Sequence, residues 1–212
     1  MLFLHRKTKL VEMDYKVLSK EELLKGEAIL AAQKLFQQYG FHKTTMEDIA
    51  KAMGRGKSTL YYYYKSKDEI FNAVITQEIA DVYKITKKAI EKVDTAEEKL
   101  KVYFSASLKA VKCRAILYKI LKGEVLENLE QINILIKKFN TQEVQSIKEI
   151  MMLGIENKEF VETLKPDIDL LAYSTVSALR SLAVDLIIED KFPDWDERLN
   201  VIISIILKGI KN

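Results

Sequence analysis

The sequence is poor in residues that break helices, cross-link chains or ligate metals. It has one cysteine, Cys113, two histidines, two prolines and seven glycines among 212 residues. A single cysteine excludes an intrachain disulfide and is typical of a protein in a reducing compartment. The few helix-breaking residues, the recurrence of Leu, Ile, Lys, Glu and Ala, and the lack of strand-and-turn patterns together predict an all-α protein.

The sequence also lacks the common motifs of catalysis and of cofactor binding. It contains no phosphate-cradling glycine loop, no His/Cys cluster with zinc spacing and no nucleophile motif of the GxSxG type. We therefore expect no enzyme, no metal and no cofactor. His42 has neither a second histidine nor a paired carboxylate nearby, so we interpret it as a surface residue and not as a ligand.

Long apolar runs and a strong net charge are both missing. We find no apolar run of the ~18 residues that cross a bilayer, and the opening MLFLHRK is too short for a signal-peptide core. We expect a cytoplasmic protein without a membrane partner. The net charge of +3 is uneven, because residues 1–70 carry 13 Lys and Arg against 9 Asp and Glu, and the remainder 21 against 22. A mildly basic front end suits an anionic partner, although ordinary surface variation also produces such a surplus.

Capping residues, prolines and glycines divide the chain into helical segments. Residues 1–18 have no clear period and are predicted to form a flexible arm, within which Met13 is an alternative starting residue. Ser19 and Glu22 form a capping-box pattern that opens a helix ending at Gly40. Beyond residue 65, the apolar spacing predicts helices over 66–92, 94–111, 114–126, 127–157, 166–189 and 193–208.

Residues 45–64 carry the pattern of a helix-turn-helix. Thr45 can cap a short helix that ends near Met53, and the tight turn Gly54–Gly56 follows. A second short helix begins at Lys57 and contains four consecutive tyrosines, residues 61–64. Two short helices joined by a glycine turn, the second of them basic and aromatic, are typical of a unit that reads DNA.

With these residues in view, the front end resembles the TetR/AcrR family of bacterial transcription regulators. The resemblance covers roughly residues 27–74, about a quarter of the chain. It rests on residues that keep the register of the family pattern: Ile29, Ala32, Leu35, Phe36, Gly40, Phe41, Thr44, Thr45, Asp48, Ile49, Ala50, Gly54, Thr59, Leu60, Tyr61, Tyr63, Ser66 and Lys67. Four positions depart from it: Gly56 stands where serine is usual, Ser58 where glycine is usual, Tyr64 where phenylalanine is common and Met53 where alanine is common.

The resemblance implies two functional parts. We expect a three-helix, homeodomain-like DNA-binding domain over residues 19–70, and a helical effector-binding and dimerisation domain over residues 71–212.

A helix in the major groove reads base edges with the exposed side chains near its N-terminus. We expect base contacts from Arg55, Lys57, Ser58 and Tyr62, with a phosphate contact as the alternative for Lys57. Phosphate contacts are expected from Lys65 by its position, and from Thr45, Tyr63 and Lys67 because the resemblance makes them the usual phosphate-binding positions. Tyr61 and Tyr64 are expected to be mostly structural, since helical spacing turns both toward the first helix.

The last two expected helices are too apolar for surface helices that bury one side only. The resemblance implies that they form a four-helix bundle with a second copy of the chain; a simple monomeric core is the alternative. The expected interface residues are Leu171, Ala178, Leu182, Leu186, Ile202, Ile205 and Ile206.

The resemblance further implies a small-molecule pocket within residues 71–190. Mixed methionine and aromatic side chains there would suit an apolar or aromatic effector, and Arg180 could pair with an acidic one, with Asp185 or with a partner chain. The candidate lining is Phe104, Leu108, Tyr118, Phe139, Met151, Met152, Tyr173, Ser177 and Arg180. For all of these except Arg180, a place in the plain core is the favoured alternative.

These features predict a dimeric repressor that binds a palindromic operator and is released by a small molecule. A ligand-sequestering dimer with a degenerate DNA-binding domain is the first alternative, and an architectural protein that binds DNA of any sequence is another. The intact Thr45, Tyr63, Lys67 and basic turn favour the repressor.

Overall fold

The computed structural model describes residues 19–124 and 129–212, so the arm predicted for residues 1–18 lies outside the described residues. The predicted all-α class is confirmed, and the described part contains no strand beyond an isolated bridge between Phe160 and Lys211. The elements in chain order are α1 (Lys20–Tyr39), α2 (Met46–Ala52), α3 (Lys57–Tyr63), α4 (Lys67–Ile90), α5 (Ala96–Glu124), α6 (Leu129–Glu156), the 3₁₀ segment η2 (Glu162–Asp167), α7 (Ile168–Ala183), the π-helical segment η3 (Val184–Ile188) and α8 (Trp195–Lys208).

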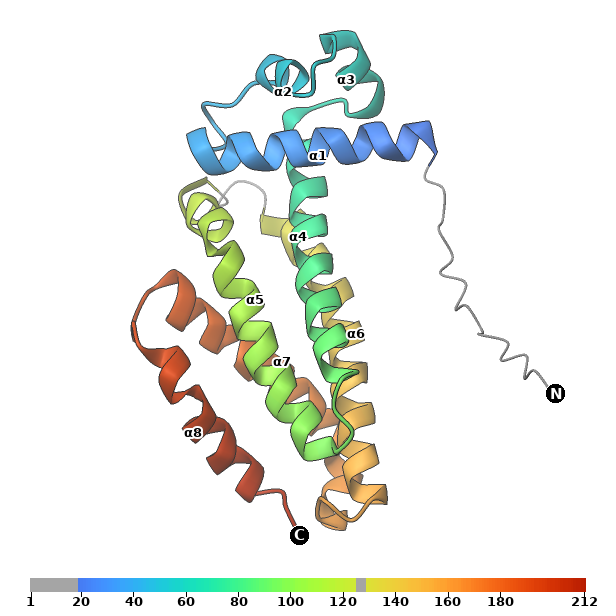
Figure 1. Ribbon diagram of the computed structural model, residues 1–212, viewed down its shortest axis with the longest axis vertical. Helices are drawn as coiled ribbons and strands as arrows, with labels where there is room; N and C mark the ends of the chain where they lie inside the picture. Colours follow the sequence, from blue (N-terminus) through green and yellow to red (C-terminus); the bar gives the residue numbers. More distant parts are fainter. Residues whose placement is uncertain (1–18, 125–128) are drawn as a thin grey trace, which may run out of the picture.

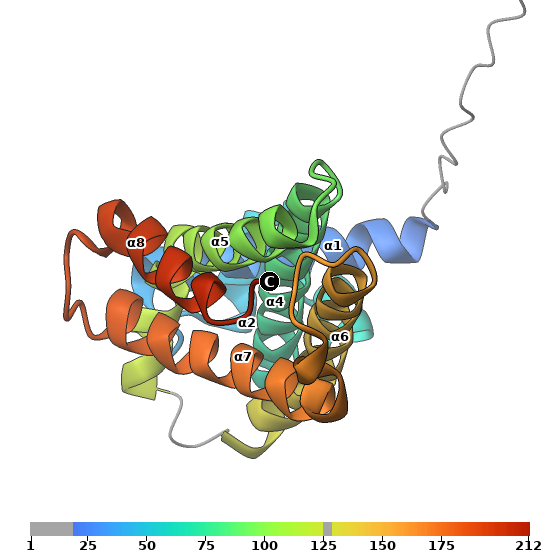
Figure 2. The same cartoon turned by 90° about the horizontal axis from the view of Figure 1, so that it is seen from below.

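The helices form a small head and a larger body that share α4. Helix α1 lies across one end of α4, with α2 and α3 beyond it, and α4 runs on into a body built from α5 to α8 (Figure 1). Seen from below, α7 packs against α6, whereas α8 lies beside α5 on the side of the body opposite α6 (Figure 2). This arrangement makes α4 the continuous element between the head and the body.

Two hydrophobic clusters correspond to the head and the body. The head cluster joins α1 to α4 through the rings of Phe36, Phe41 and Phe71, whose centroids lie 4.7–5.7 Å apart. It extends along α4 as far as Ile75. The body cluster runs from Ala96 to Leu207. Because the first two turns of α4 belong to the head cluster, a domain boundary at residue 70 would cut through packed side chains; that boundary remains a prediction.

The predicted helix starts in the head are confirmed. Ser19 and Glu22 form a full capping box at α1, and Thr45 and Asp48 form another at α2. At α4 the hydroxyl of Ser66 accepts from the N–H of Glu69 at 3.1 Å, but the Glu69 carboxylate accepts from the N–H of Lys65 instead of closing the box. These caps satisfy backbone donors that the first turn of a helix leaves unpaired.

One predicted helix boundary in the body was wrong, whereas the ends predicted near residues 157 and 189 agree with the structure. Helix α5 continues to Glu124 where a break near residue 114 was expected, since no proline or glycine interrupts residues 96–122. Helix α6 ends at Glu156, and Gly154 lies inside it. Gly154 is there because a Cβ at that position would lie 2.1 Å from the ring of Phe160. Helix α7 ends at Ala183 and continues as the π-helical η3.

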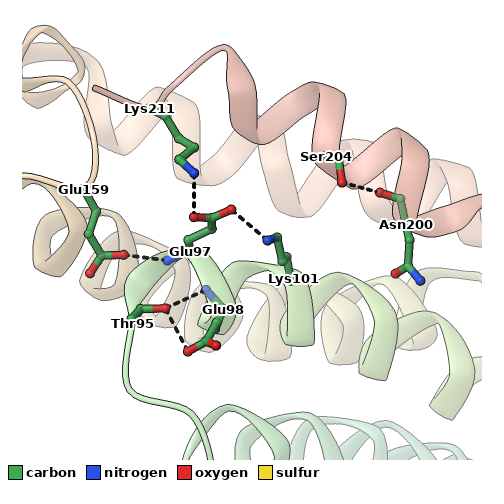
Figure 3. A network of polar contacts seen from close by, with 8 residues as sticks. All are labelled: Thr95, Glu97, Glu98, Lys101, Glu159, Asn200, Ser204 and Lys211. Carbon is green, nitrogen blue, oxygen red and sulfur yellow. Dashed lines mark hydrogen bonds and ion pairs between the residues drawn. The ribbon is translucent and has the colours of Figure 1, made fainter.

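A polar network closes the far end of the body, where the C-terminal segment meets the start of α5 (Figure 3). The carboxylate of Glu159 accepts from the N–H groups of Ala96 and Glu97 at 3.1 and 3.0 Å. Burial alone would raise the pKa of Glu159, but these donors outweigh it and the pKa is lowered. Glu97 pairs with Lys101 at 2.7 Å and with Lys211 at 2.8 Å. The network therefore holds the last residues of the chain against α5.

One stretch of the body is more apolar than the sequence analysis recognised. By length and composition alone, Glu162–Ile187 could cross a membrane, with a mean hydropathy of 1.4 over its best window, 28% of which is buried. The sequence analysis did not recognise this stretch, because Arg180 and Asp185 interrupt its apolar residues without lowering the average enough. A single helix of this kind is weak evidence for a membrane span, since core helices also pass the test.

Candidate DNA-binding interface

The link between α2 and α3 depends on one left-handed residue. Gly54 has a φ of 66°, a conformation that residues with a side chain rarely adopt. It allows the N–H of Arg55 to donate to the carbonyl of Ala50, and its own N–H to donate to the carbonyl of Lys51, both at 3.0 Å. This pair of bonds is the Schellman motif that ends many helices. The turn thus defines the direction in which α3 leaves α2.

Two side chains hold α3 against the head. Leu60 is fully enclosed and Tyr64 is buried, and both belong to the head cluster. Leu60 lies within α3, and Tyr64 is the extended residue that caps its C-terminus, its N–H donating to the carbonyl of Leu60. Desolvation by this burial raises the pKa of the Tyr64 phenol. The opposite face of α3 and its N-terminus are left exposed at the end of the molecule (Figure 1).

The four residues expected to contact bases lie on this exposed surface. Arg55, Lys57, Ser58 and Tyr62 are all exposed, Tyr62 to 71%. Arg55 and Lys57 each face an exposed glutamate, at 3.6 and 3.8 Å. Exposed ion pairs of this kind contribute about 0–1 kcal/mol, so an incoming base or phosphate can replace them at small cost.

Three of the expected phosphate contacts lie beside this surface. Thr45 is exposed, and its hydroxyl donates to the carboxylate of Asp48 at 2.6 Å, an interaction that lowers the pKa of Asp48. Tyr63 is partly buried, with its ring edge-on to Tyr62 at 4.9 Å. Lys65 is exposed, and its ammonium donates to the last carbonyl groups of α3 at 3.1 Å. A cation at this helix end is favourable, and an exposed ammonium can also reach a phosphate.

Lys67, the fourth expected phosphate contact, is committed to the protein itself. Its ammonium donates to the carbonyl oxygens of Phe41, Thr44 and His42 at 2.8, 3.0 and 3.4 Å. It also lies 4.2 Å from the centroid of the Phe41 ring. Lys67 therefore ties the start of α4 to the loop between α1 and α2. Its three ammonium donors already have acceptors, which makes it first a structural residue.

The expectation that Tyr61 is mostly structural was wrong, whereas Tyr64 is buried as expected. Tyr61 is 39% exposed, and the ammonium of Lys57 lies 5.9 Å from its ring centroid. The buried residue of α3 is Leu60, with the buried Tyr64 following as the C-cap, and a residue next to Leu60 is rotated by about 100° from the buried face. The four-residue spacing was the signal that could have identified Tyr61 as part of the exposed surface.

The chain matches known proteins most strongly in the head. Residues 28–74 match the family described as bacterial regulatory proteins, tetR family. The HTH-type transcriptional regulator RutR of Escherichia coli is 44% identical over 66 residues, which is 31% of each chain. The aligned part spans only 30–32% of the length of RutR and of two HTH-type regulators of Bacillus subtilis, YvaF and YhgD.

Solved structures extend the likeness to the body. A transcriptional regulator from Cytophaga hutchinsonii has a TM-score of 0.72 at 27% identity, over 87% of this chain and 97% of that one. The chain belongs to the tetR family of bacterial regulatory proteins. FadR of Bacillus subtilis, solved in complex with stearoyl-CoA, has a TM-score of 0.64 at 23% identity, over 87% of this chain and 98% of that one. The family is one of regulators and not of enzymes, as the sequence analysis expected.

The residues expected to line an effector pocket are not gathered around one cavity in this TetR-family protein. Phe104, Leu108 and Met151 are buried in the body cluster, and Met152 packs partly against it. Tyr173 is 59% exposed on α7, so its assignment to a pocket was wrong. Phe139 and Ser177 are partly buried, and the side chain of Tyr118 lies outside the described residues.

Arg180 does not pair with Asp185 as one alternative had it. Its guanidinium donates to the side-chain carbonyl of Asn140 on α6, and Asp185 pairs with Lys191. Arg180 is nevertheless close enough to Glu143 to influence its ionisation. Arg180 therefore links α7 to α6 inside the body.

A different set of residues surrounds a cavity of about 240 Å³ between α4, α5 and α6. None of the nine expected pocket residues lines it. Its walls come from Tyr83, Thr86, Lys87, Ile90, Glu91, Lys99, Tyr103, Glu143, Ser146, Glu149, Ile150 and Leu153. Sequence periodicity misses such a site, because the polar members face inward from three different helices.

The expected dimer residues divide between the surface and the core. Ala178, Ile202, Ile205 and Ile206 are exposed on α7 and α8, as an interface requires. Leu186 is buried in the body cluster, and Leu171 and Leu182 are partly buried against it. These three residues therefore belong mainly to the core of their own chain. The sequence analysis missed four further exposed apolar residues that share these two elements and η3: Leu170, Tyr173, Val184 and Val201. We call these eight residues the α7–α8 face.

A buried ion pair connects the head to the body. Glu78 on α4 is 5% exposed, and its carboxylate pairs with the guanidinium of Arg114 on α5 at 2.7 Å. Its other oxygen accepts from the side-chain amide of Gln33 on α1. Burial raises the pKa of Glu78, Arg114 and Gln33 oppose that shift, and Asp81 adds to it. Sequence periodicity gave no sign of this junction, since Glu78 reads as an ordinary polar position on a surface helix.

Proposed function

We propose that this protein is a transcriptional repressor that binds a palindromic operator as a homodimer and is released by a small molecule in the bacterial cytoplasm. The observation that carries the proposal is the exposed surface of α3. Basic and aromatic side chains stand out from a helix that Leu60 and Tyr64 hold rigidly on the head. Such a helix fits the major groove of B-DNA.

The α7–α8 face supports dimerisation. Its apolar residues include Ile205, 65% exposed, and Leu170, 64% exposed. Monomeric soluble proteins rarely leave a contiguous apolar patch uncovered. A second copy packed by two-fold symmetry would cover the face and would present two α3 helices to successive major grooves, roughly 34–36 Å apart.

The position of α4 supports a switch. Its first turns pack in the head, and its later turns form one wall of the cavity in the body. A ligand in the cavity that shifts α4 would change the spacing of the two α3 helices. A coupling of about 1–3 kcal/mol between effector and operator lowers DNA affinity about 5–150-fold.

The ligand of one similar protein suggests the first effector to test. FadR of Bacillus subtilis was solved with stearoyl-CoA, and its identity of 23% supports a shared fold and no more. An acyl-CoA is therefore a candidate effector, to be compared with other small molecules.

The test is fluorescence anisotropy with DNA from upstream of the protein's own gene, against a scrambled duplex, at several salt concentrations. We expect the upstream DNA to bind at least ~10³-fold more tightly. Equal, weak and salt-driven binding to both, followed by failure to select any preferred sequence from a random library, would contradict the proposal. That result would favour the architectural or the sequestering alternative.

A variant of Lys57 separates its two expected roles. If Lys57 contacts only phosphate, Lys57→Ala weakens binding equally on all sequences and reduces the salt slope by about one. If it reads a base, the variant loses about 1–3 kcal/mol at one position of the operator and relaxes specificity there. Lys84→Ala, at an exposed position on α4 in the body, is the matched control and should leave binding unchanged.

A further inference from the structure

The cavity between α4, α5 and α6 has apolar walls and two inward polar groups. Ile90, Ile150 and Leu153 contribute apolar surface, whereas Tyr103 and Glu143 contribute a phenol and a carboxylate. A volume of about 240 Å³ lies just below the ~300–1,000 Å³ of common ligand sites. A compact ligand therefore fits this space better than a long chain does.

The two polar groups lack hydrogen-bond partners within the described part of the protein. Tyr103 is 2% exposed, and no described donor or acceptor pairs with its hydroxyl. No described N–H or O–H group donates to the carboxylate of Glu143, and no described cation lies within ion-pair distance of it. Neither group is sealed from solvent, since Glu143 is only partly buried and the Tyr103 hydroxyl is not among the fully enclosed side-chain atoms without a partner in the described residues. A ligand that enters the cavity displaces this solvent, so it must itself supply the donor that these groups then need.

The charges around Glu143 favour a positively charged donor. The cavity lining carries three carboxylates, Glu91, Glu143 and Glu149, and two ammonium groups. One of these, that of Lys99, already donates to the carbonyl oxygens of Val93 and Ile90, at 2.5 and 3.3 Å. Of the two lysines that line the cavity, Lys87 is therefore the one whose ammonium is not held by backbone carbonyl groups of the described residues.

Arg180 on α7 is the remaining cation that influences Glu143. It is not part of the lining, and it is held by Asn140. Its charge favours the carboxylate form of Glu143 and so opposes the effect of burial, but Arg180 does not occupy the cavity.

We infer that this cavity binds a compact apolar molecule with a protonated amine at one end, the ammonium donating to the carboxylate of Glu143 beside the hydroxyl of Tyr103. The inference rests on the proposed function only in taking the cavity as the effector site. A charge-assisted hydrogen bond is roughly twice as strong as a neutral one, which makes the amine preferable to an alcohol. An acid of the same size would meet the Glu143 carboxylate and be repelled.

The experiment uses three probes with one apolar body: hexylamine, hexanol and hexanoate. Each is titrated calorimetrically into the full-length protein without DNA, so that the result does not depend on any operator. We expect hexylamine to bind at least ~10-fold more tightly than hexanol, a difference of about 1.4 kcal/mol, with hexanoate weakest. Stearoyl-CoA is a fourth arm, expected to bind more weakly than hexylamine.

Variants locate the effect. Glu143→Gln should abolish the preference for hexylamine over hexanol while leaving hexanol binding intact. Tyr103→Phe should weaken the binding of every probe that forms a hydrogen bond with the Tyr103 hydroxyl. Glu149→Gln, at an exposed rim position, is the matched control and should change the preference by less than about twofold. Thermal unfolding checks the folding of each variant; Glu143→Gln should not be destabilised, because it removes an unpaired charge.

The pH dependence adds an independent readout. Burial raises the pKa of Glu143 and Arg180 partly opposes it. As pH falls through that pKa the carboxylate gains a proton, so affinity for hexylamine should fall while that for hexanoate should rise. The other ionisable groups facing this space are Lys87, Glu91, Lys99, Tyr103 and Glu149. Tighter binding of hexanoate or stearoyl-CoA, an unchanged preference in Glu143→Gln, or no binding of any probe would overturn the inference and leave the operator test untouched.

Discussion

Removing Arg114 should destabilise the junction between head and body far more than its partly exposed position suggests. Arg114→Met keeps the aliphatic length of the side chain but leaves the carboxylate of Glu78 in the protein interior without its counter-ion. The side chain of Glu78 is 7% exposed and that of Arg114 is 21% exposed. The lost contact at 2.7 Å is the shorter of the two that Arg114 makes, the other being to Asp81 at 3.4 Å.

The magnitude follows from the buried partner. Breaking a buried ion pair from one side typically costs about 3–5 kcal/mol, because an uncompensated charge is left behind. The Arg114 side chain is 21% exposed to water, so we expect the lower end, about 3 kcal/mol. The double variant Glu78→Gln/Arg114→Met removes both charges while Gln33 keeps a hydrogen-bond partner. It should recover most of the loss.

The assay is urea unfolding at fixed protein concentration, since the proposed dimer would make stability depend on concentration. Burial raises the pKa of Glu78, so its ionised form opposes folding. Stability associated with this carboxyl is present below the unfolded pKa of Glu, about 4.3, and is lost as pH rises through the raised folded value. The loss of stability in Arg114→Met should therefore shrink on acidification.

Lys25→Met, in an exposed pair, is the control and should change stability by less than ~0.5 kcal/mol. A loss under ~1 kcal/mol for Arg114→Met, or no recovery in the double variant, would refute the reasoning.

Three further predictions concern single features. Lys67→Met should lose about 1–3 kcal/mol of stability, because carbonyl oxygens of the α1–α2 loop lose their donor. In the same urea assay, the control Lys65→Met should lose less than ~0.5 kcal/mol of stability. A larger loss for Lys65→Met than for Lys67→Met would show that Lys67 is not structural. Ile205→Asp should convert a dimer to monomers in analytical ultracentrifugation, and a persistent dimer would place the interface elsewhere. The lowered pKa of Glu159 stabilises the fold above the unfolded value near 4.3, so Glu159→Gln should flatten the loss of stability as pH falls below it.

The head was largely predictable from the sequence because its signals are local. Capping boxes, a glycine with positive φ and an apolar stripe each act within four residues, and Ser19, Thr45 and Gly54 were identified correctly. The same applies to α8, where Pro193 and Asp194 precede a helix that begins at Trp195. Local patterns of this kind depend on backbone geometry more than on tertiary packing.

The body was less predictable because its sites are assembled from distant residues. The cavity takes Tyr83, Tyr103 and Glu143 from three helices, and each reads in its own helix as an ordinary amphipathic position. The apolar excess of α7 was recognised, but its division into core and surface was not, since Leu170 and Leu171 differ by about 100° around the helix. Only the packing of neighbouring helices decides which of the two meets the body cluster.

The placement of polar groups along α4 has a consequence for how a ligand signal could reach DNA. Glu78 lies on α4 between Ile75, the last buried member of the head cluster, and Tyr83, the first residue of the cavity. A hydrophobic contact there would permit small sliding movements, whereas a buried ion pair tolerates little change in distance. A ligand that moves α4 in the body must therefore either carry Arg114, Glu78 and Gln33 along together or break the pair. The first outcome transmits the movement to α1 and the head, and in Arg114→Met that transmission should weaken even at saturating effector.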